Sequence, residues 1–559
     1  MKWLQLNFSR QSVLFKLVLV LTIVFLVYAV LSTSILWIEP TDWGLVNRLP
    51  PVYYAGLFLL GILWYIGVKS KSYLPAALIL TVGYLYVAPA LIRVPVWTSN
   101  SYYPFGESLL INSSGHLPTG SPPTIGNYHY WPLFLYFSST LTTVTGVPHD
   151  ILLKFFPLFT VSMYGLLAVL ILRIKLAPQL AFLGVAWILA SLFIRQQYFG
   201  PQAIAYIFFL LIILVVSRLF FTDEAHPRTM AVLLFLLFVV TTLIHPLTSF
   251  MSMIVLAAGY LANRVLKRKI SAPLGLLTLG AVIVWVGYNS FIAITFFREA
   301  IEHFFEIFAG TREISLYSQP SRIIGSTAQR INFVASWAIV GLGVIVALLS
   351  IVHIVRKLRA KHSVATYWVF SAALLIMVGL FGFFGEYGPQ ESFTRAFMFG
   401  LLPLSFLCVS FLARKPKLIV ALITVLLFLN IPAQYGSDNY RLATDTQLSG
   451  TAFLASYTPD DISIVGELTL YIKYHNPLKN YTILSLGLAV PITEAPNSTR
   501  IAEGLSTTDY IIISDLQHNY FMFYLGEDPL EEQAKLQILN RAYDNGRFQL
   551  LSPMNASND

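Results

Sequence analysis

The stretch LVLVLTIVFLVYAVLSTSILW, Leu17 to Trp37, decides the fold class of this chain. It carries no charged residue, and an apolar helix of about 20 residues is long enough to cross the hydrocarbon core of a bilayer. Lys2, Arg10 and Lys16 precede it, but the run is too long for the core of a signal peptide and no small-residue cleavage site follows. We therefore expect residues 12–37 to form a first transmembrane helix that is retained.

Apolar runs of this kind recur through most of the chain. Hydrophobic residues make up 56% of the 559 residues and charged residues 11%, whereas a soluble domain carries about a quarter charged residues. Such a chain cannot cover itself with a polar surface, so lipid must be the solvent for most of it. The sequence therefore predicts a polytopic α-helical membrane protein with about 13 transmembrane helices. The expected spans are 12–37, 52–68, 74–92, 151–172, 178–194, 202–221, 229–244, 247–263, 273–297, 332–355, 365–384, 396–412 and 418–435.

The composition changes after the last of these spans, because acidic residues outnumber basic ones from Ser437 onward. We expect a transmembrane domain over residues 1–435 and a soluble, extracytoplasmic α/β domain over residues 436–559. Short runs rich in β-branched residues predict strands at 462–466, 481–486, 509–515 and 548–551, and helical patterns at 447–457 and 529–542 alternate with them. This alternation favours a small parallel or mixed sheet.

Charge and cysteine content exclude two classes of function. The net charge is +9, but the basic residues are not gathered into a patch with interleaved aromatic residues, so we expect no nucleic-acid partner. The single cysteine, Cys408, lies inside an apolar run, which excludes an intramolecular disulfide framework and a cysteine-based metal site.

The charged residues also predict the orientation in the membrane. Basic clusters such as Arg264–Lys269 and Arg356–Lys361 fall on one side of the expected spans, and that side should be cytoplasmic. The carboxylates of the membrane region fall on the other side, apart from Asp223 and Glu224. The sequence therefore predicts a multi-pass protein of the plasma membrane with a cytoplasmic N-terminus and its chemistry on the outer face. Sequons at Asn112, Asn480, Asn497 and Asn555 lie on that face, although Asn7 lies on the other.

Two long outer connections, about 93–150 and 298–331, contrast with the short ones elsewhere and favour a functional role. The first should contain a surface helix at 101–110 and an aromatic cluster at 127–131, which also fits an aromatic belt. In the second, residues 298–306 predict an amphipathic interfacial helix whose glutamates are either a solvated face or part of a site. Polar residues at the outer ends of other spans, at 195–202 and 245–249, are costly unless they face a protein cavity.

Several arginines on the outer face oppose the positive-inside bias. Guanidinium groups match phosphate oxygens geometrically, so these residues are candidates for binding a lipid-linked phosphate; salt bridges among neighbouring loops are the alternative. The arginines in question are Arg195, Arg312, Arg322, Arg330 and Arg395.

Segments spread over nearly the whole chain resemble the GT-C superfamily of polytopic membrane glycosyltransferases, in its archaeal and bacterial forms. The resemblance rests on Asn100-Ser-Tyr-Tyr-Pro-Phe-Gly-Glu107 with Gly115-His-Leu-Pro118, on Leu153-Lys-Phe-Phe-Pro157, on Arg395-Ala-Phe-Met-Phe-Gly-Leu-Leu-Pro403 and on the tail segment Ala542-Tyr-Asp-Asn-Gly-Arg-Phe548. It implies an enzyme that moves a sugar from a polyprenyl (dolichyl) phosphate carrier to a glycan or protein acceptor outside the cytoplasm.

The resemblance also implies an acidic residue on the surface helix of the first large loop, where this chain has Asn100. Asparagine cannot take a proton, so either Glu107 or Asp42 supplies the carboxylate, or catalysis has been lost. The chemistry needs a carboxylate for the acceptor and cationic or hydrogen-bonding groups for the departing phosphate. Candidates for the first role are Asp42, Glu107, Glu386 and Glu391; candidates for binding substrate and phosphate are Asn100, Arg195, Gln196, Tyr198, His245, Arg322, Arg330 and Arg395.

No cofactor is required by this scheme. His116, His129 and His245 could join carboxylates around a divalent cation, but their irregular spacing is not that of a metal site. Two further functions stay open: a catalytically inactive scaffold with the same fold, and a flippase or transporter of lipid-linked sugars. A transporter typically places ionisable residues in the middle of its spans, whereas here they cluster at span ends, which favours chemistry at the interface.

Overall fold

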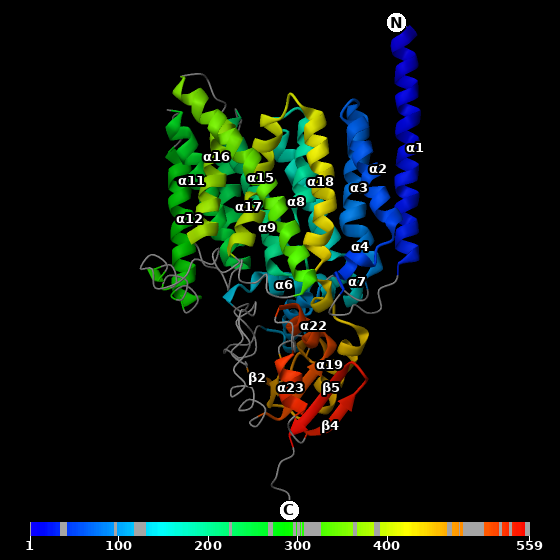
Figure 1. Cartoon of the computed structure of the whole chain (residues 1–559). Coiled ribbons are helices and arrows are strands. Elements are labelled where there is room, and N and C mark those ends of the chain that lie inside the picture. Colours follow the sequence, from blue (N-terminus) through cyan, green and yellow to red (C-terminus); the bar gives the residue numbers. More distant parts are fainter. Residues whose placement is uncertain are drawn as a thin grey trace, which may run out of the picture.

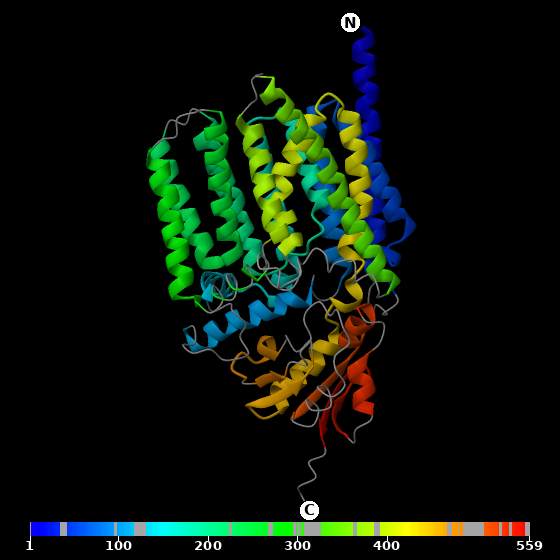
Figure 2. The ribbon, with the colours of Figure 1, turned by 60° about the vertical axis from the view of Figure 1, so that its left-hand side comes forward.

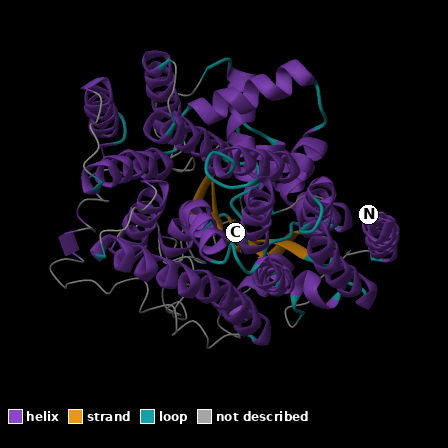
Figure 3. Cartoon of the chain, turned by 90° about the horizontal axis from the view of Figure 1, so that it is seen from above, coloured by secondary structure: helices purple, strands orange, loops and turns teal. Residues whose placement is uncertain are grey.

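The computed structural model consists of a bundle of long helices and a small α/β domain at one end of it, which we call the tail (Figure 1). Seen along the bundle, the strands of the tail lie beneath the helices (Figure 3). The structure describes residues 2–33, 42–93, 98–116, 130–222, 226–266, 272–294, 298, 302, 305–306, 326–360, 366–384, 392–466, 472–479, 481–484, 508–524, 528–535 and 539–553.

Every predicted span coincides with a helix or a helix pair of the bundle, and the multi-pass helical fold class is confirmed. Among the described residues, nine helices are long and apolar enough to cross a membrane and four shorter ones are apolar; the total of thirteen stays a prediction. The bundle helices are α1 (Lys2–Ser32), α2 (Pro51–Gly67), α3 (Leu74–Val82), α4 (Ala88–Ile92), α7 (His149–Leu172), α8 (Pro178–Ser191), α9 (Pro201–Phe221), α10 (Pro227–Ile244), α11 (Pro246–Val265), α12 (Ala272–Phe291), α15 (Thr327–Arg359), α16 (Thr366–Phe384), α17 (Ser392–Phe411) and α18 (Pro416–Tyr435).

Proline sets the beginning of many of these helices. At the first helical position its missing N–H is not needed and its fixed φ angle already suits the helix. This explains why α8, α9 and α11 begin at Pro178, Pro201 and Pro246. The side chain of His245 caps α11, because its Nδ1 accepts the backbone N–H of Thr248 at 3.3 Å. The N-terminal ends of α9 and α11, where predicted site residues lie, are therefore fixed by local sequence.

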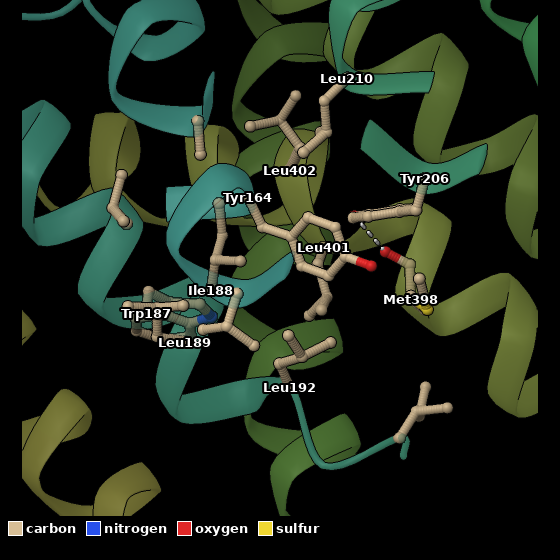
Figure 4. Packing of buried hydrophobic residues seen from close by; sticks show 14 of the residues in the cluster. Tyr164, Trp187, Ile188, Leu189, Leu192, Tyr206, Leu210, Met398, Leu401 and Leu402 are labelled. Atoms are coloured by element: carbon tan, nitrogen blue, oxygen red, sulfur yellow. Dashed lines mark hydrogen bonds between the residues drawn. The ribbon is translucent and has the colours of Figure 1, made fainter. Parts of the chain in front are cut away.

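The core of the bundle holds α7, α8, α9 and α17 together (Figure 4). In lipid a buried hydroxyl must find a partner inside the protein. Accordingly, Tyr206 of α9 donates to the carbonyl of Met398 in α17 at 3.0 Å, and Tyr164 of α7 donates to Ala203 at 2.8 Å. These bonds hold α7 and α17 against the beginning of α9.

Two further helices belong to the first long connection. The expected surface helix is α5 (Tyr102–Ser114), which lies across the lower end of the bundle between the bundle and the tail (Figure 2). The second, α6 (Leu133–Thr145), was not predicted, although its apolar residues recur at helical spacing between the Ser and Thr residues. The two helices are joined by polar side chains: Asn112 accepts from Ser139 and donates to Thr142 at 3.2 Å.

The tail contains a five-stranded mixed sheet in the order β2-β1-β3-β5-β4. Strands β1, β2 and β3 run parallel, and β5 pairs antiparallel with both β3 and β4. The strands are β1 (Ile462–Val465), β2 (Tyr481–Leu484), β3 (Tyr510–Ser514), β4 (Leu539–Asp544) and β5 (Phe548–Pro553), and the helical segments are η7 (Asp438–Tyr440), α19 (Asp445–Tyr457), α20 (Ile472–His475), α22 (Asp515–Tyr524) and α23 (Pro529–Lys535).

One part of the predicted tail is wrong. The helix expected over 529–542 ends at Lys535, and residues from Leu539 form strand β4 instead. The sequence of β4 has no β-branched residue, so its extended conformation comes from pairing with β5 across the turn at Gly546. Helix α22 was also missed. Residues 509–515 predicted a strand, and Asp515, the first residue of α22, was assigned to the turn after that strand.

Candidate functional site

A buried charge cluster joins the beginning of the tail to the bundle. Asp438 of η7 forms ion pairs with Arg93, which follows α4, and with Arg195, whose Nη2 lies 2.6 Å from its Oδ1. All three side chains are buried, and the Arg93 guanidinium stacks over the ring of Tyr435 at 4.3 Å from the centroid. Buried charges are costly unless they are paired. We call these four residues the junction cluster.

The loop that carries Asp42 packs against the junction cluster. Gly44 has a φ angle of +59°, and a Cβ atom there would lie 2.0 Å from the carbonyl oxygen of Tyr435, so only glycine fits. Asp42 itself pairs with Arg48 and accepts from the Asn47 amide at 3.1 Å, and its side chain is 15% exposed. Its carboxylate is thus partly open to solvent at the end of the bundle next to the tail.

Glu107 lies on α5, where the tail covers it. Its side chain is 2% exposed, and its Oε1 has no hydrogen-bond partner among the described residues. A Cβ atom on the preceding Gly106 would lie 2.8 Å from the backbone of Lys473, so the backbones of α5 and α20 nearly touch. Burial raises the pKa of the Glu107 carboxyl to about 7, against the opposing charge of Lys473. Burial likewise lowers the pKa of the Lys473 ammonium.

This shift makes the docking of α20 on α5 sensitive to pH. The pKa of Glu107 rises from its ordinary 4.5 to about 7 on folding, so the native state binds the proton more tightly and the contribution to stability falls as pH rises through that window. The loss is at most about 3 kcal/mol between pH 4.5 and 7. We expect the thermal stability of wild-type protein to decline over this window and Glu107→Gln to remove most of the decline. Equal pH profiles for the two proteins would contradict this reading.

A second polar group lies at the ends of three bundle helices that face the tail. Arg395 of α17 donates from Nη1 to Oε1 of Gln202, in the first turn of α9, at 2.6 Å. His245, the cap of α11, is buried and lies within electrostatic reach of Arg395. We call Arg395, Gln202 and His245 the arginine group. The structure thus brings together two residues that the sequence singled out separately.

The other predicted site residues that the structure describes are spread over the end of the bundle next to the tail. Gln196 and Tyr198 lie with Arg195 in the connection between α8 and α9, and Asn100 is exposed in the turn before α5. Arg330 is exposed in the first turn of α15, close to the tail, since the backbone N–H of Ser326 donates to Phe523 at 3.2 Å. Glu386, Glu391, Arg312, Arg322, His129 and the sequons at Asn480, Asn497 and Asn555 lie outside the described residues.

Asp438 and Lys473 were not predicted as part of any site. Asp438 follows the last predicted span directly, and an acid at that point, on the same predicted side of the membrane as several arginines, is the signal that could have found it. For metals, the described part of the chain brings together one group of donors, His518, Asp528 and Glu531 in the tail. His116 and His245 do not belong to it.

Comparison of the chain with known proteins identifies a solved structure with a similar overall fold. No family model matches the chain, and no curated protein matches it. Among solved structures, the oligosaccharyltransferase of Archaeoglobus fulgidus, determined with a tethered acceptor peptide containing an NVT sequon, superposes with a TM-score of 0.50 at 12% identity, over 87% of this chain and 75% of that one. The chain therefore shares the overall fold of this oligosaccharyltransferase, which agrees with the fold that the sequence resemblance implied.

Proposed function

We propose that this chain is a membrane glycosyltransferase that moves a sugar from a polyprenyl (dolichyl) phosphate carrier to a glycan or protein acceptor outside the cytoplasm. The observation that carries the proposal is the arginine group. In a bundle with a GT-C-like fold, it places a guanidinium, an amide and an imidazole at the helix ends that face the tail.

The arginine group suits a departing phosphate. The hydrogen bond to Gln202 holds the planar Arg395 guanidinium in one orientation. A guanidinium held in this way matches the oxygens of a phosphate. The Nδ1 of neutral His245 accepts the Thr248 amide hydrogen, so the ring carries its own hydrogen on Nε2. Both side chains can therefore donate to phosphate oxygens as negative charge develops on them, and at a dry interface such donors stabilise a transition state strongly.

The carboxylate for the acceptor has two candidates. Asp42 is partly exposed and forms an ion pair with Arg48, so its carboxylate lies where it could orient an acceptor hydroxyl or amide. Glu107 has a pKa of about 7, which suits a general base, but α20 covers it. We assign the acceptor role to Asp42 and a docking role to Glu107.

The experiment is sugar transfer by full-length protein in liposomes, from a radiolabelled polyprenyl-phosphate sugar to a membrane acceptor fraction. Asp42→Asn should lower the rate at least a hundredfold, whereas Glu107→Gln and the exposed control Asp460→Asn should retain it. Loss of transfer in Glu107→Gln with full activity in Asp42→Asn would reverse the assignment. The divalent cation that the sequence leaves open is tested by adding EDTA, with His518→Gln included to separate a tail metal from one at the arginine group.

The proposal includes the orientation expected from the charges: a plasma-membrane protein with the N-terminus cytoplasmic and the tail outside. Support comes from the placement of the arginine group, the junction cluster and Glu107 at the tail end of the bundle. The partners are then the lipid bilayer, the lipid-linked sugar and its acceptor.

An inactive scaffold is the second candidate. It is favoured by exposed Asn100, which cannot exchange a proton, and by the burial of Glu107. A scaffold, or a flippase, would bind the polyprenyl-phosphate sugar at the arginine group without releasing polyprenyl phosphate. Measuring donor binding and product formation on the same sample separates these functions from an enzyme.

A further inference from the structure

Three metal-ligating side chains meet in the tail, away from the arginine group. His518 lies on α22, Asp528 immediately before α23, and Glu531 in the first turn of α23. The Nδ1 atom of His518 is 3.1 Å from Oδ2 of Asp528 and 3.1 Å from Oε2 of Glu531. The donor atoms all lie within 4.8 Å of one another.

A hydrogen-bond network accounts poorly for this arrangement. An imidazole nitrogen carries at most one hydrogen, so Nδ1 cannot donate fully to two carboxylates at once. The same separations fit a coordination sphere, because neighbouring ligands at about 2.1 Å from an octahedral ion lie about 3.0 Å apart. The edges of 3.1 Å from Nδ1 to each oxygen are close to that value.

The surroundings orient the ligands before any ion binds. Asp528 is 6% exposed, and its other oxygen, Oδ1, accepts the backbone N–H groups of Leu530 at 3.2 Å and Glu531 at 3.1 Å, which leaves Oδ2 directed at His518. Lys535 holds the other oxygen of Glu531 at 2.7 Å. Supporting contacts of this kind fix metal ligands in place. The His518 and Glu531 side chains are only partly buried, which leaves room for water to complete the sphere.

We propose that His518, Asp528 and Glu531 bind a divalent transition-metal ion. One imidazole nitrogen and two carboxylate oxygens suit Zn²⁺ or Mn²⁺. The ion replaces the proton that lies between His518 and the two carboxylates, and it links α22 to the beginning of α23.

The metal has a structural consequence because α22 is one of the helices by which the tail contacts the bundle. Asn519 donates to the carbonyl of Asn439 in η7 at 2.7 Å, and the carbonyl of Phe523 accepts from Ser326 at the beginning of α15. An ion at the neighbouring His518 therefore stabilises the docked position of the tail. This inference does not depend on sugar transfer.

The test uses full-length protein in detergent, stripped with EDTA and dialysed, then titrated calorimetrically with Zn²⁺ and with Mn²⁺. We expect one equivalent of at least one ion to bind and to raise the melting temperature by several degrees. His518→Gln and Glu531→Gln should each weaken binding at least tenfold, whereas the controls His116→Ala and Glu532→Gln should bind as wild type does. Circular dichroism and gel filtration check folding of each variant.

Two results would overturn the proposal. One is the absence of stoichiometric binding of either ion to folded wild-type protein. The other is wild-type affinity in both His518→Gln and Glu531→Gln, which would place any bound ion elsewhere.

Discussion

Asparagine in place of Asp438 is expected to destabilise the protein by about 3–5 kcal/mol, because it removes the anion from between two buried guanidinium groups. Asp438 pairs with both Arg93 and Arg195, and these are its ion-pair partners in the described part of the chain. Without the carboxylate the two cations face each other in a low-dielectric environment. The measurement is the melting temperature in detergent, followed by intrinsic fluorescence, together with protease sensitivity of the tail.

The control is Asp460→Asn, an acid whose side chain is 72% exposed and which pairs with Lys479 at 3.7 Å. The Asp460 carboxylate is exposed, and the buried Lys479 ammonium also donates to the carbonyl of Thr458. Loss of this long pair should therefore cost about 0–1 kcal/mol, and the variant should melt close to wild type. A second check is the double variant Asp438→Asn with Arg195→Gln, which should be more stable than Asp438→Asn alone because one unpaired buried charge has been removed. Wild-type stability in Asp438→Asn would contradict the assignment of the junction cluster.

Alanine in place of Arg395 is expected to lower sugar transfer by about 10²–10³-fold, the usual effect of losing one strong donor to a developing negative charge. The substitution should lower the rate constant of transfer more than it lowers the affinity for the lipid-linked donor. Arg395→Lys should recover part of the rate, since lysine restores the charge but not the planar set of donors that Gln202 orients. The readout is release of labelled sugar from polyprenyl phosphate under saturating donor.

The matched control for Arg395 is Arg414→Ala, an exposed arginine that follows α17 at the opposite end of the bundle. It removes the same side chain from a helix terminus without touching the arginine group, so it should retain the wild-type rate. Folded Arg395→Ala with the wild-type rate would exclude Arg395 from the site.

The bundle was predictable because each span is a local property of the sequence. An apolar run such as Leu17–Trp37 needs only the bilayer as its partner, and proline at positions such as Pro201 marks where a helix begins. Strand β4 and helix α22 were missed for the opposite reason. The conformation of β4 depends on pairing with β5, and α22 packs against η7. Such contacts between separate segments cannot be predicted from the local sequence.

The candidate site divides in the same way. Arg395 and His245 could be found as polar residues at the ends of apolar spans. The ion pair of Arg93 with Asp438 joins residues 345 positions apart in the sequence, so only the folded chain reveals it. Glu107 was a candidate for the catalytic carboxylate, together with Asp42, because the family resemblance implies an acid on the surface helix where this chain has Asn100. Its cover by α20 is likewise a tertiary feature.

The most direct measurement of the central claim is transfer by the unmodified protein. Full-length chain in liposomes is given a radiolabelled polyprenyl-phosphate sugar and a membrane acceptor fraction, and both the glycosylated product and free polyprenyl phosphate are quantified. We expect the two to appear together, at a rate that Arg395→Ala lowers by about 10²–10³-fold and Arg414→Ala leaves intact. Donor binding at the arginine group without either product, in protein that is folded by the melting assay, would contradict the account.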